Sequence, residues 1–109
     1  MDNKSDLLSV ERPHPLVNKK QLGNYIRGAR HTAGYRSQRE CVAALAPLGC
    51  RMTAWTLGAI ERGDRIPSLD EFVALTLLLR PPGGMRYFIM PSIDDDSARI
   101  LLDISHRGD

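Results

Sequence analysis

One short pattern recurs three times along the chain: a residue that can cap a helix is followed, three positions later, by Gln or Glu. The first N–H groups of a helix lack partners, and such a pair can satisfy two of them. A fourth position, Thr53, is flanked by Met52 and Leu57 at the spacing of a hydrophobic contact across a helix start. The sequence therefore predicts helices that begin after Asn18, Ser37, Thr53 and Ser68.

Stop signals follow these starts in order. Glycine closes helices because it adopts a left-handed backbone at little cost, and Gly34, Gly49 and Gly63 follow the first three segments. The run Pro-Pro-Gly-Gly at 81–84 ends the fourth. Between these signals the apolar residues recur at helical spacing. We therefore expect an all-α fold, a bundle of four to five short helices with short arms.

The length of 109 residues allows one modest core. A hydrophobic content of 42% and a charged content of 26% exclude disordered and fibrous classes. We expect a flexible arm over 1–17, the helical domain over 18–80 and an extension over 81–109. Residues 85–90 fit a short strand or a helical turn equally well. The acidic run 94–96 predicts a further helix start, since it lacks the spacing and glycine of a calcium loop.

Charge is distributed unevenly along the chain. Residues 1–65 hold eleven Lys or Arg and six Asp or Glu, whereas residues 66–109 hold four and seven. Between Lys19 and Arg51 there are seven basic residues and one acid, Glu40. A local excess of this kind attracts phosphate backbones, although a solvated basic face is the alternative interpretation.

Several other classes find no support in the sequence. The first ten residues lack the apolar core of a signal peptide, and the apolar run 72–79 is far shorter than the ~20 residues that span a bilayer. We expect a cytoplasmic protein without a membrane partner. Cys41 and Cys50 have no metal-binding or redox spacing, which favours buried, reduced thiols. No cofactor, metal ion or enzymatic activity is expected.

A set of motifs in fixed order resembles the XRE family of helix-turn-helix regulators, which includes the phage repressors and Cro. These motifs are Arg30, Gly34, Ser37-Gln38, Thr53, Ile60-Glu61-Arg62-Gly63 and Pro67-Ser68-Leu69. The resemblance covers roughly residues 20–79. It implies a lambda-repressor-like fold, in which the helix after Ser37 crosses the backbone of double-stranded DNA and the helix after Thr53 lies in the major groove. It also implies a partly buried ion pair between Arg30 and Glu61.

The resemblance assigns DNA contacts to named positions. Phosphate contacts are implied for Lys19, Lys20, Arg36, Arg39 and Arg51, and a phosphate or base contact for Gln38. Base-reading positions are Ala54, Trp55, Gly58 and Ala59, with help from Thr53 and Thr56. None of the four carries the Gln, Asn or Arg that pairs bidentately with a base edge. Apolar contact with thymine methyl groups, or the reading of DNA shape, would have to compensate.

Two further expectations concern the turn and the partner. The connection between the second and third helices is long and contains Pro47, so the second helix should end or kink near 43–46. The implied function is a sequence-specific regulator, a repressor that binds a palindromic operator as a homodimer. The expected dimer interface consists of Leu75, Leu78, Leu79, Tyr87, Phe88 and Ile89. The alternative is a protein-interaction module, such as an antitoxin or antirepressor partner, with Trp55 as its anchor. A position of Trp55 in the core is a further alternative.

Overall fold

The computed structural model describes residues 16–93, which form an all-helical bundle, as predicted. Five α-helices and two 3₁₀ turns follow one another, and this range contains no strand. The elements are α2 (Lys19–Thr32), α3 (Gln38–Leu45), η1 (Ala46–Leu48), α4 (Ala54–Arg62), α5 (Leu69–Leu79), α6 (Met85–Ile89) and η2 (Met90–Ser92). Residues 1–15, and the helix expected after 94–96, lie outside the described range.

All four predicted capping residues begin the helices assigned to them. Ser37 and Ser68 each form a reciprocal box, in which the serine hydroxyl accepts from the backbone N–H three residues on and the Glu side chain accepts from the N–H of the serine. Asn18 accepts from the Gln21 N–H at 3.0 Å. Thr53 accepts from the Thr56 N–H at 3.0 Å. These local bonds fix where each helix starts because they supply partners for otherwise unpaired donors.

The helix ends also follow local chemistry. Pro47 limits α3, which stops at Leu45 and tightens into η1, in agreement with the expected break. Gly63 closes α4 with a left-handed φ of 84°. The end of α5 differs, because the left-handed residue there is Arg80, with φ 48°, directly before Pro81. A non-glycine residue in this region is uncommon, and the proline that follows prevents the helix from continuing.

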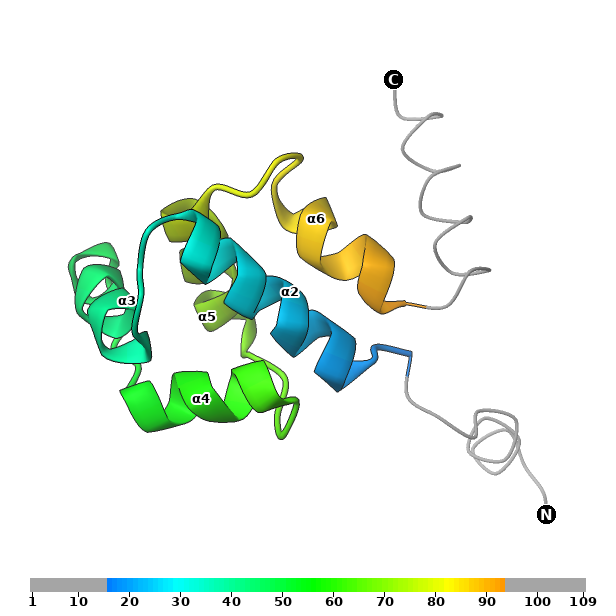
Figure 1. Cartoon of the computed structure of the whole chain (residues 1–109), viewed down its shortest axis with the longest axis horizontal. Coiled ribbons are helices and arrows are strands. Elements are labelled where there is room, and N and C mark those ends of the chain that lie inside the picture. Colours follow the sequence, from blue (N-terminus) through cyan, green and yellow to red (C-terminus); the bar gives the residue numbers. More distant parts are fainter. Residues whose placement is uncertain (1–15, 94–109) are drawn as a thin grey trace, which may run out of the picture.

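The helix α2 lies at the centre of the bundle (Figure 1). It packs against α4, α5 and α6, while α3 packs against α4 and α5. In Figure 1, α4 lies below α2, α5 lies behind it, and α3 and α6 lie at opposite ends. The buried side chains form one core: Leu22, Ile26, Ala29, Cys41, Leu45, Cys50, Met52, Leu57, Ile60, Phe72, Ala74, Leu75, Leu79 and Phe88.

Residues 81–93, the described part of the extension expected over 81–109, contribute to this core. Residues 85–89 form a helix, and Phe88 is fully buried with its ring 5.7 Å from that of Phe72. Leu75 and Leu79 are buried as well. These three side chains are therefore unavailable to a second chain. The other expected interface residues, Leu78, Tyr87 and Ile89, are partly buried against the same core.

The two ends of the described range meet. Val17 and Ile93 form an isolated antiparallel bridge, and the Asn18 N–H donates to the Ser92 carbonyl at 2.7 Å. The buried Ser92 hydroxyl donates to the Phe88 carbonyl at 2.7 Å, which ties this contact to α6. The start of α2 and the end of η2 are consequently held together.

Candidate nucleic-acid interface

Two glycines allow α2 and α4 to approach each other closely. A Cβ added at Gly23 of α2 would lie 2.5 Å from the Glu61 carbonyl oxygen and nearer still to that of Ile60. A Cβ added at Gly63 would lie 2.8 Å from the Lys20 Cα. Because real Cβ atoms do not approach backbone so closely, both positions need glycine. The close approach sets the relative position of the side chains that the two helices carry.

Arg30 of α2 and Glu61 of α4 form a buried, bidentate ion pair. Arg30 Nε donates to Glu61 Oε2 at 2.7 Å, and Nη2 donates to Oε1 at 3.1 Å. The residues are only 4% and 6% exposed. Arg30 Nη1 also donates to the Tyr35 carbonyl at 2.9 Å. The hydrogen bond with Glu61 raises the pKa of Arg30 and outweighs the opposing effect of burial. The pair thus joins α2, α4 and the turn before α3.

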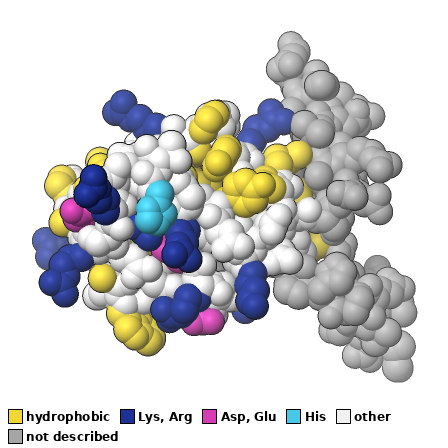
Figure 2. All heavy atoms as spheres, viewed as in Figure 1, with side chains coloured by type: hydrophobic (Ala, Val, Ile, Leu, Met, Phe, Trp, Pro, Cys, Tyr) yellow, Lys and Arg dark blue, Asp and Glu magenta, His cyan; other side chains and the backbone are white. Residues whose placement is uncertain are grey.

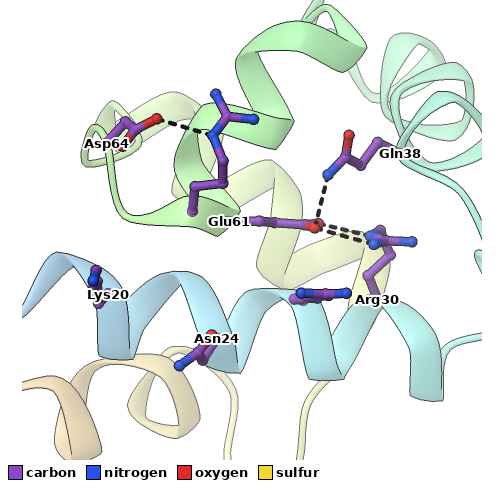
Figure 3. Close-up of a pocket in the computed structure, with 8 residues that line it drawn as sticks. Lys20, Asn24, Arg30, Gln38, Glu61 and Asp64 are labelled. Carbon is purple, nitrogen blue, oxygen red and sulfur yellow. Dashed lines mark hydrogen bonds and ion pairs between the residues drawn. The ribbon is translucent and has the colours of Figure 1, made fainter.

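Gln38, the first residue of α3, is attached to the same carboxylate. Its Nε2 donates to Glu61 Oε1 at 3.1 Å, as Figure 3 shows. The half-buried Gln38 side chain passes over Gly58 of α4. A Cβ added at Gly58 would lie 3.1 Å from Gln38 Oε1 and 3.1 Å from Arg62 Nη1. The side chain at the start of α3 therefore has one defined position relative to α4, which preorganises it for a ligand.

A polar groove of about 740 Å³ opens beside this network. Its walls come from α2, the start of α3 and the end of α4 (Figure 3). The residues that line it are Lys20, Asn24, Arg27, Arg30, Gln38, Glu61, Arg62 and Asp64. Glu61 is occupied by Arg30 and Gln38, and Asp64 accepts from Arg62 Nε at 3.0 Å in an exposed pair. Four cations and two acids leave the groove with a positive balance, which suits an anionic ligand.

Four of these lining residues are absent from the site predicted from sequence: Asn24, Arg27, Arg62 and Asp64. Lys20, Asn24 and Arg27 follow one another at spacings of four and three, so they share one face of α2. This polar face, next to the buried Leu22, could have been recognised from the sequence as a candidate binding surface. Arg62 stands seven positions after Trp55, which places both on one face of α4.

The predicted phosphate contacts all lie on the surface. Lys19 and Lys20 are in the first turn of α2, Arg36 and Arg39 flank the start of α3, and Arg51 precedes α4; all five are exposed. Figure 2 shows Lys and Arg side chains over α3 and along the edge formed by α4. The start of α3 also provides free backbone N–H groups, which favour an anion. These elements can together follow a phosphate backbone.

The first turn of α4 presents one dominant side chain. Trp55 is 78% exposed, the highest fraction among the large hydrophobic residues of the described range. Ala54 and Thr56 are half-buried. The Thr53 hydroxyl is already engaged, since it accepts from the Thr56 N–H and donates to the Thr56 Oγ1 at 3.0 Å. Trp55 is therefore the main group that α4 offers to a partner, and it is not a core residue.

Two predicted base-reading positions are wrong. Gly58 is buried beneath Gln38 and Arg62, and Ala59 is only 5% exposed. Neither can reach a base edge, because other parts of the chain cover them. The exposed residues of α4 are Trp55 at its start and Arg62 at its end. The Gln38 side chain from α3 covers Gly58 beside Arg62.

The two cysteines are free and buried. Burial raises the pKa of Cys41 to about 11, and burial likewise raises the pKa of Cys50. Both sulfurs are therefore thiols at neutral pH, in keeping with the expected role as small apolar core residues. Among residues 16–93, no three His, Cys, Asp or Glu side chains cluster as they would around a metal ion.

None of the helices described for this chain is long and apolar enough to cross a bilayer. Comparison of the chain with protein-family models, curated proteins and solved structures finds no match.

Proposed function

We propose that the chain is a sequence-specific, DNA-binding transcriptional regulator of the XRE type, a cytoplasmic repressor that binds a palindromic operator as a homodimer. The observation that carries the proposal is the basic groove between α2 and α4, with Gln38 held at its edge by Glu61. The positive balance of this groove supports contact with a phosphate backbone. The function proposed is binding, without an enzymatic step or a cofactor.

In this proposal, different side chains of the interface provide affinity and specificity. Lys20, Arg27 and Arg62 supply salt-dependent affinity through phosphates. Gln38 keeps both a donor and an acceptor with which to bond an adenine edge or a phosphate, since only one of its amide hydrogens is used. Trp55 adds apolar contact, for example with thymine methyl groups. Specificity then comes from few contacts and from DNA shape.

The test begins with selection of duplexes from a random pool by the full chain. We expect the selected sequences to share a palindromic element. Binding to this duplex should weaken steeply with salt, with a slope in log K against log salt of about 0.9 per phosphate contacted. Arg62→Ala should reduce the slope by about one contact on every sequence tested. Arg86→Ala removes the same charge from the exposed surface of α6, outside the groove, and should leave the slope unchanged.

The exposure of Trp55 favours a second candidate, a protein-interaction module on the same fold that serves as an antitoxin or antirepressor partner. Exposed tryptophans are frequent anchors of protein interfaces. The two candidates respond differently to substitution. Arg39→Ala and Arg51→Ala should abolish retention of DNA under the first, whereas Trp55→Ala should abolish capture of a protein partner under the second. If the chain selects no duplex and captures a protein partner in a Trp55-dependent way, the proposal of a regulator is wrong and that of a protein-interaction module is favoured.

A further inference from the structure

The helix α5 has an exposed apolar stripe in addition to its buried face. Leu69, Val73 and Leu77 are 73%, 39% and 60% exposed, although each belongs to a residue type that is usually buried. They follow one another at intervals of four residues, so they are neighbours along one side of the helix. Their helix is also the most apolar of the bundle, because its opposite side supplies Phe72, Leu75 and Leu79 to the core. Contiguous exposed apolar residues of this kind mark an interaction surface.

Two charges of opposite sign border the stripe. Asp70 lies three positions before Val73, and Arg80 lies three positions after Leu77, so each sits beside the apolar residue nearest to it. Both are exposed, and the ion pairs among residues 16–93 do not include either. The acidic group is at the start of α5 and the basic group is at its end.

The spacing of these four residues is symmetrical about position 75. Val73 and Leu77 are equidistant from it, and so are Asp70 and Arg80. If two copies of α5 cross antiparallel about a two-fold axis at this level, Val73 of one copy lies against Leu77 of the other. The same register brings Asp70 of each copy beside Arg80 of the other, twice per dimer. A self-complementary patch is what an interface between identical chains requires.

We infer that α5 forms the homodimer interface, through an antiparallel pairing of its Leu69, Val73 and Leu77 face with that of a second copy. This inference rests on the dimeric part of the proposed function and names its surface. That surface differs from the interface expected from the sequence, which consisted of Leu75, Leu78, Leu79, Tyr87, Phe88 and Ile89. One helical stripe is smaller than the about 800 Å² per partner of a standard interface. The dimer is therefore weak and depends on concentration, and an operator that holds two copies side by side favours it.

The experiment is sedimentation equilibrium of the full chain without DNA, over about 1 µM to 1 mM. We expect a reversible monomer–dimer equilibrium. Leu77→Lys should weaken it about tenfold or more, because each dimer loses two buried leucines. Leu77 is exposed in the monomer, so this variant should retain its helical circular dichroism. The matched control, Leu48→Lys, makes the same change at an exposed leucine of η1 and should leave the equilibrium unchanged.

Exchange of the charges at positions 70 and 80 tests the antiparallel register of the two α5 helices. Asp70→Arg and Arg80→Asp should each weaken the dimer about fivefold, since each replaces two attractive pairs with repulsive ones. The double variant should recover association to within about twofold, because the attraction is restored with its signs reversed. Asp is suited to position 80, because it tolerates the left-handed backbone there.

The dimer experiments and the DNA-selection experiment can fail independently of each other. A monomer at all concentrations, or a dimer that Leu77→Lys does not weaken, would overturn the interface, and so would a dimer that Leu48→Lys weakens as much as Leu77→Lys does. A dimer that responds to Leu77→Lys but not to the charge exchange would overturn the antiparallel register. A monomeric chain that still selects a duplex contradicts this inference and the dimeric part of the proposed function, but not DNA binding. A dimer with the expected responses that selects no duplex contradicts DNA binding alone.

Discussion

Gln38 of α3 donates a hydrogen bond of 3.1 Å to the Glu61 carboxylate of α4, and that carboxylate is the one that also receives Arg30 of α2. Three helices therefore meet at a single acidic side chain. A carboxylate that is buried and fully engaged holds its partners in defined positions, provided that none of them is lost. The consequence is that stability and the geometry of the groove depend on the same few atoms.

Arg30→Met should destabilise the fold by about 3–5 kcal/mol, because it leaves the Glu61 charge buried with only Gln38 as a side-chain partner. Urea denaturation followed by circular dichroism measures this loss. Arg62→Met is the control, since its pair with Asp64 is exposed and should contribute less than about 1 kcal/mol. Equal unfolding midpoints for Arg30→Met and the unaltered chain would show that the buried pair contributes no net stability.

Gly23→Ala should destabilise the chain by about 2 kcal/mol or more, because its methyl group would press on the Ile60 and Glu61 carbonyls, which are backbone and cannot yield easily. Gly28→Ala provides the comparison within the same helix. Nothing lies within 4 Å of a Cβ there, so alanine should stabilise α2 by about 0.5–1 kcal/mol. Thermal unfolding of the two variants should therefore shift in opposite directions, and a shift of the same sign in both would contradict the close approach of α2 and α4.

Stability should fall in acid partly through Glu71. Burial favours its protonated form, but hydrogen bonds from the Ser68 N–H and from Arg65 outweigh this effect and lower the pKa of Glu71. Because the pKa of Glu71 is lowered on folding, its ionised carboxylate contributes to the free energy of unfolding. This contribution is fully present above about pH 5 and disappears as the pH falls through the pKa of the folded state. Glu71→Gln should be less stable than the unaltered chain at pH 7, by about 1 kcal/mol or less, and the difference should shrink below pH 4. A difference that stays constant between pH 7 and pH 3 would contradict this assignment.

The native chain should react slowly with iodoacetamide at neutral pH. The pKa of Cys41 is about 11 and its side chain is fully buried, so little of the reactive thiolate is present or accessible. Mass spectrometry over time should show Cys50, which is slightly exposed, modified before Cys41, and both modified quickly in urea. Rapid modification of Cys41 in the native state would mean that the core around α3 opens readily.

The starts of the helices could be predicted because capping is local. Each of Asn18, Ser37, Thr53 and Ser68 acts on donors within three residues, and no distant contact is needed to recognise it. The orientation of α5 could not be predicted in this way. Apolar residues surround most of this helix, so nothing in its sequence distinguishes the buried Leu75 from the exposed Leu77. The position of Phe88 in the core was missed for a related reason, since a segment of six residues has no decisive periodicity.

The candidate site was predicted in part. The ion pair between Arg30 and Glu61 followed from a resemblance, and the structure contains it. Arg27 and Arg62 were missed because they meet only when α2 and α4 pack, 35 residues apart in the chain. Gly58 was assigned to base contact on its helical position alone. The Gln38 side chain that covers it comes from another helix, which no reading of α4 by itself could reveal.

The bridge between Val17 and Ile93, with the Asn18 to Ser92 hydrogen bond beside it, brings the two ends of the described range together. Chain that arrives at α2 and chain that departs from η2 pass through the same place, on the side of the bundle away from α3 (Figure 1). Fluorophores attached at positions 16 and 93 would therefore start from nearly the same place. Labels at these two positions report one location, and a measurement of distance to DNA needs a second label within α3 or α4.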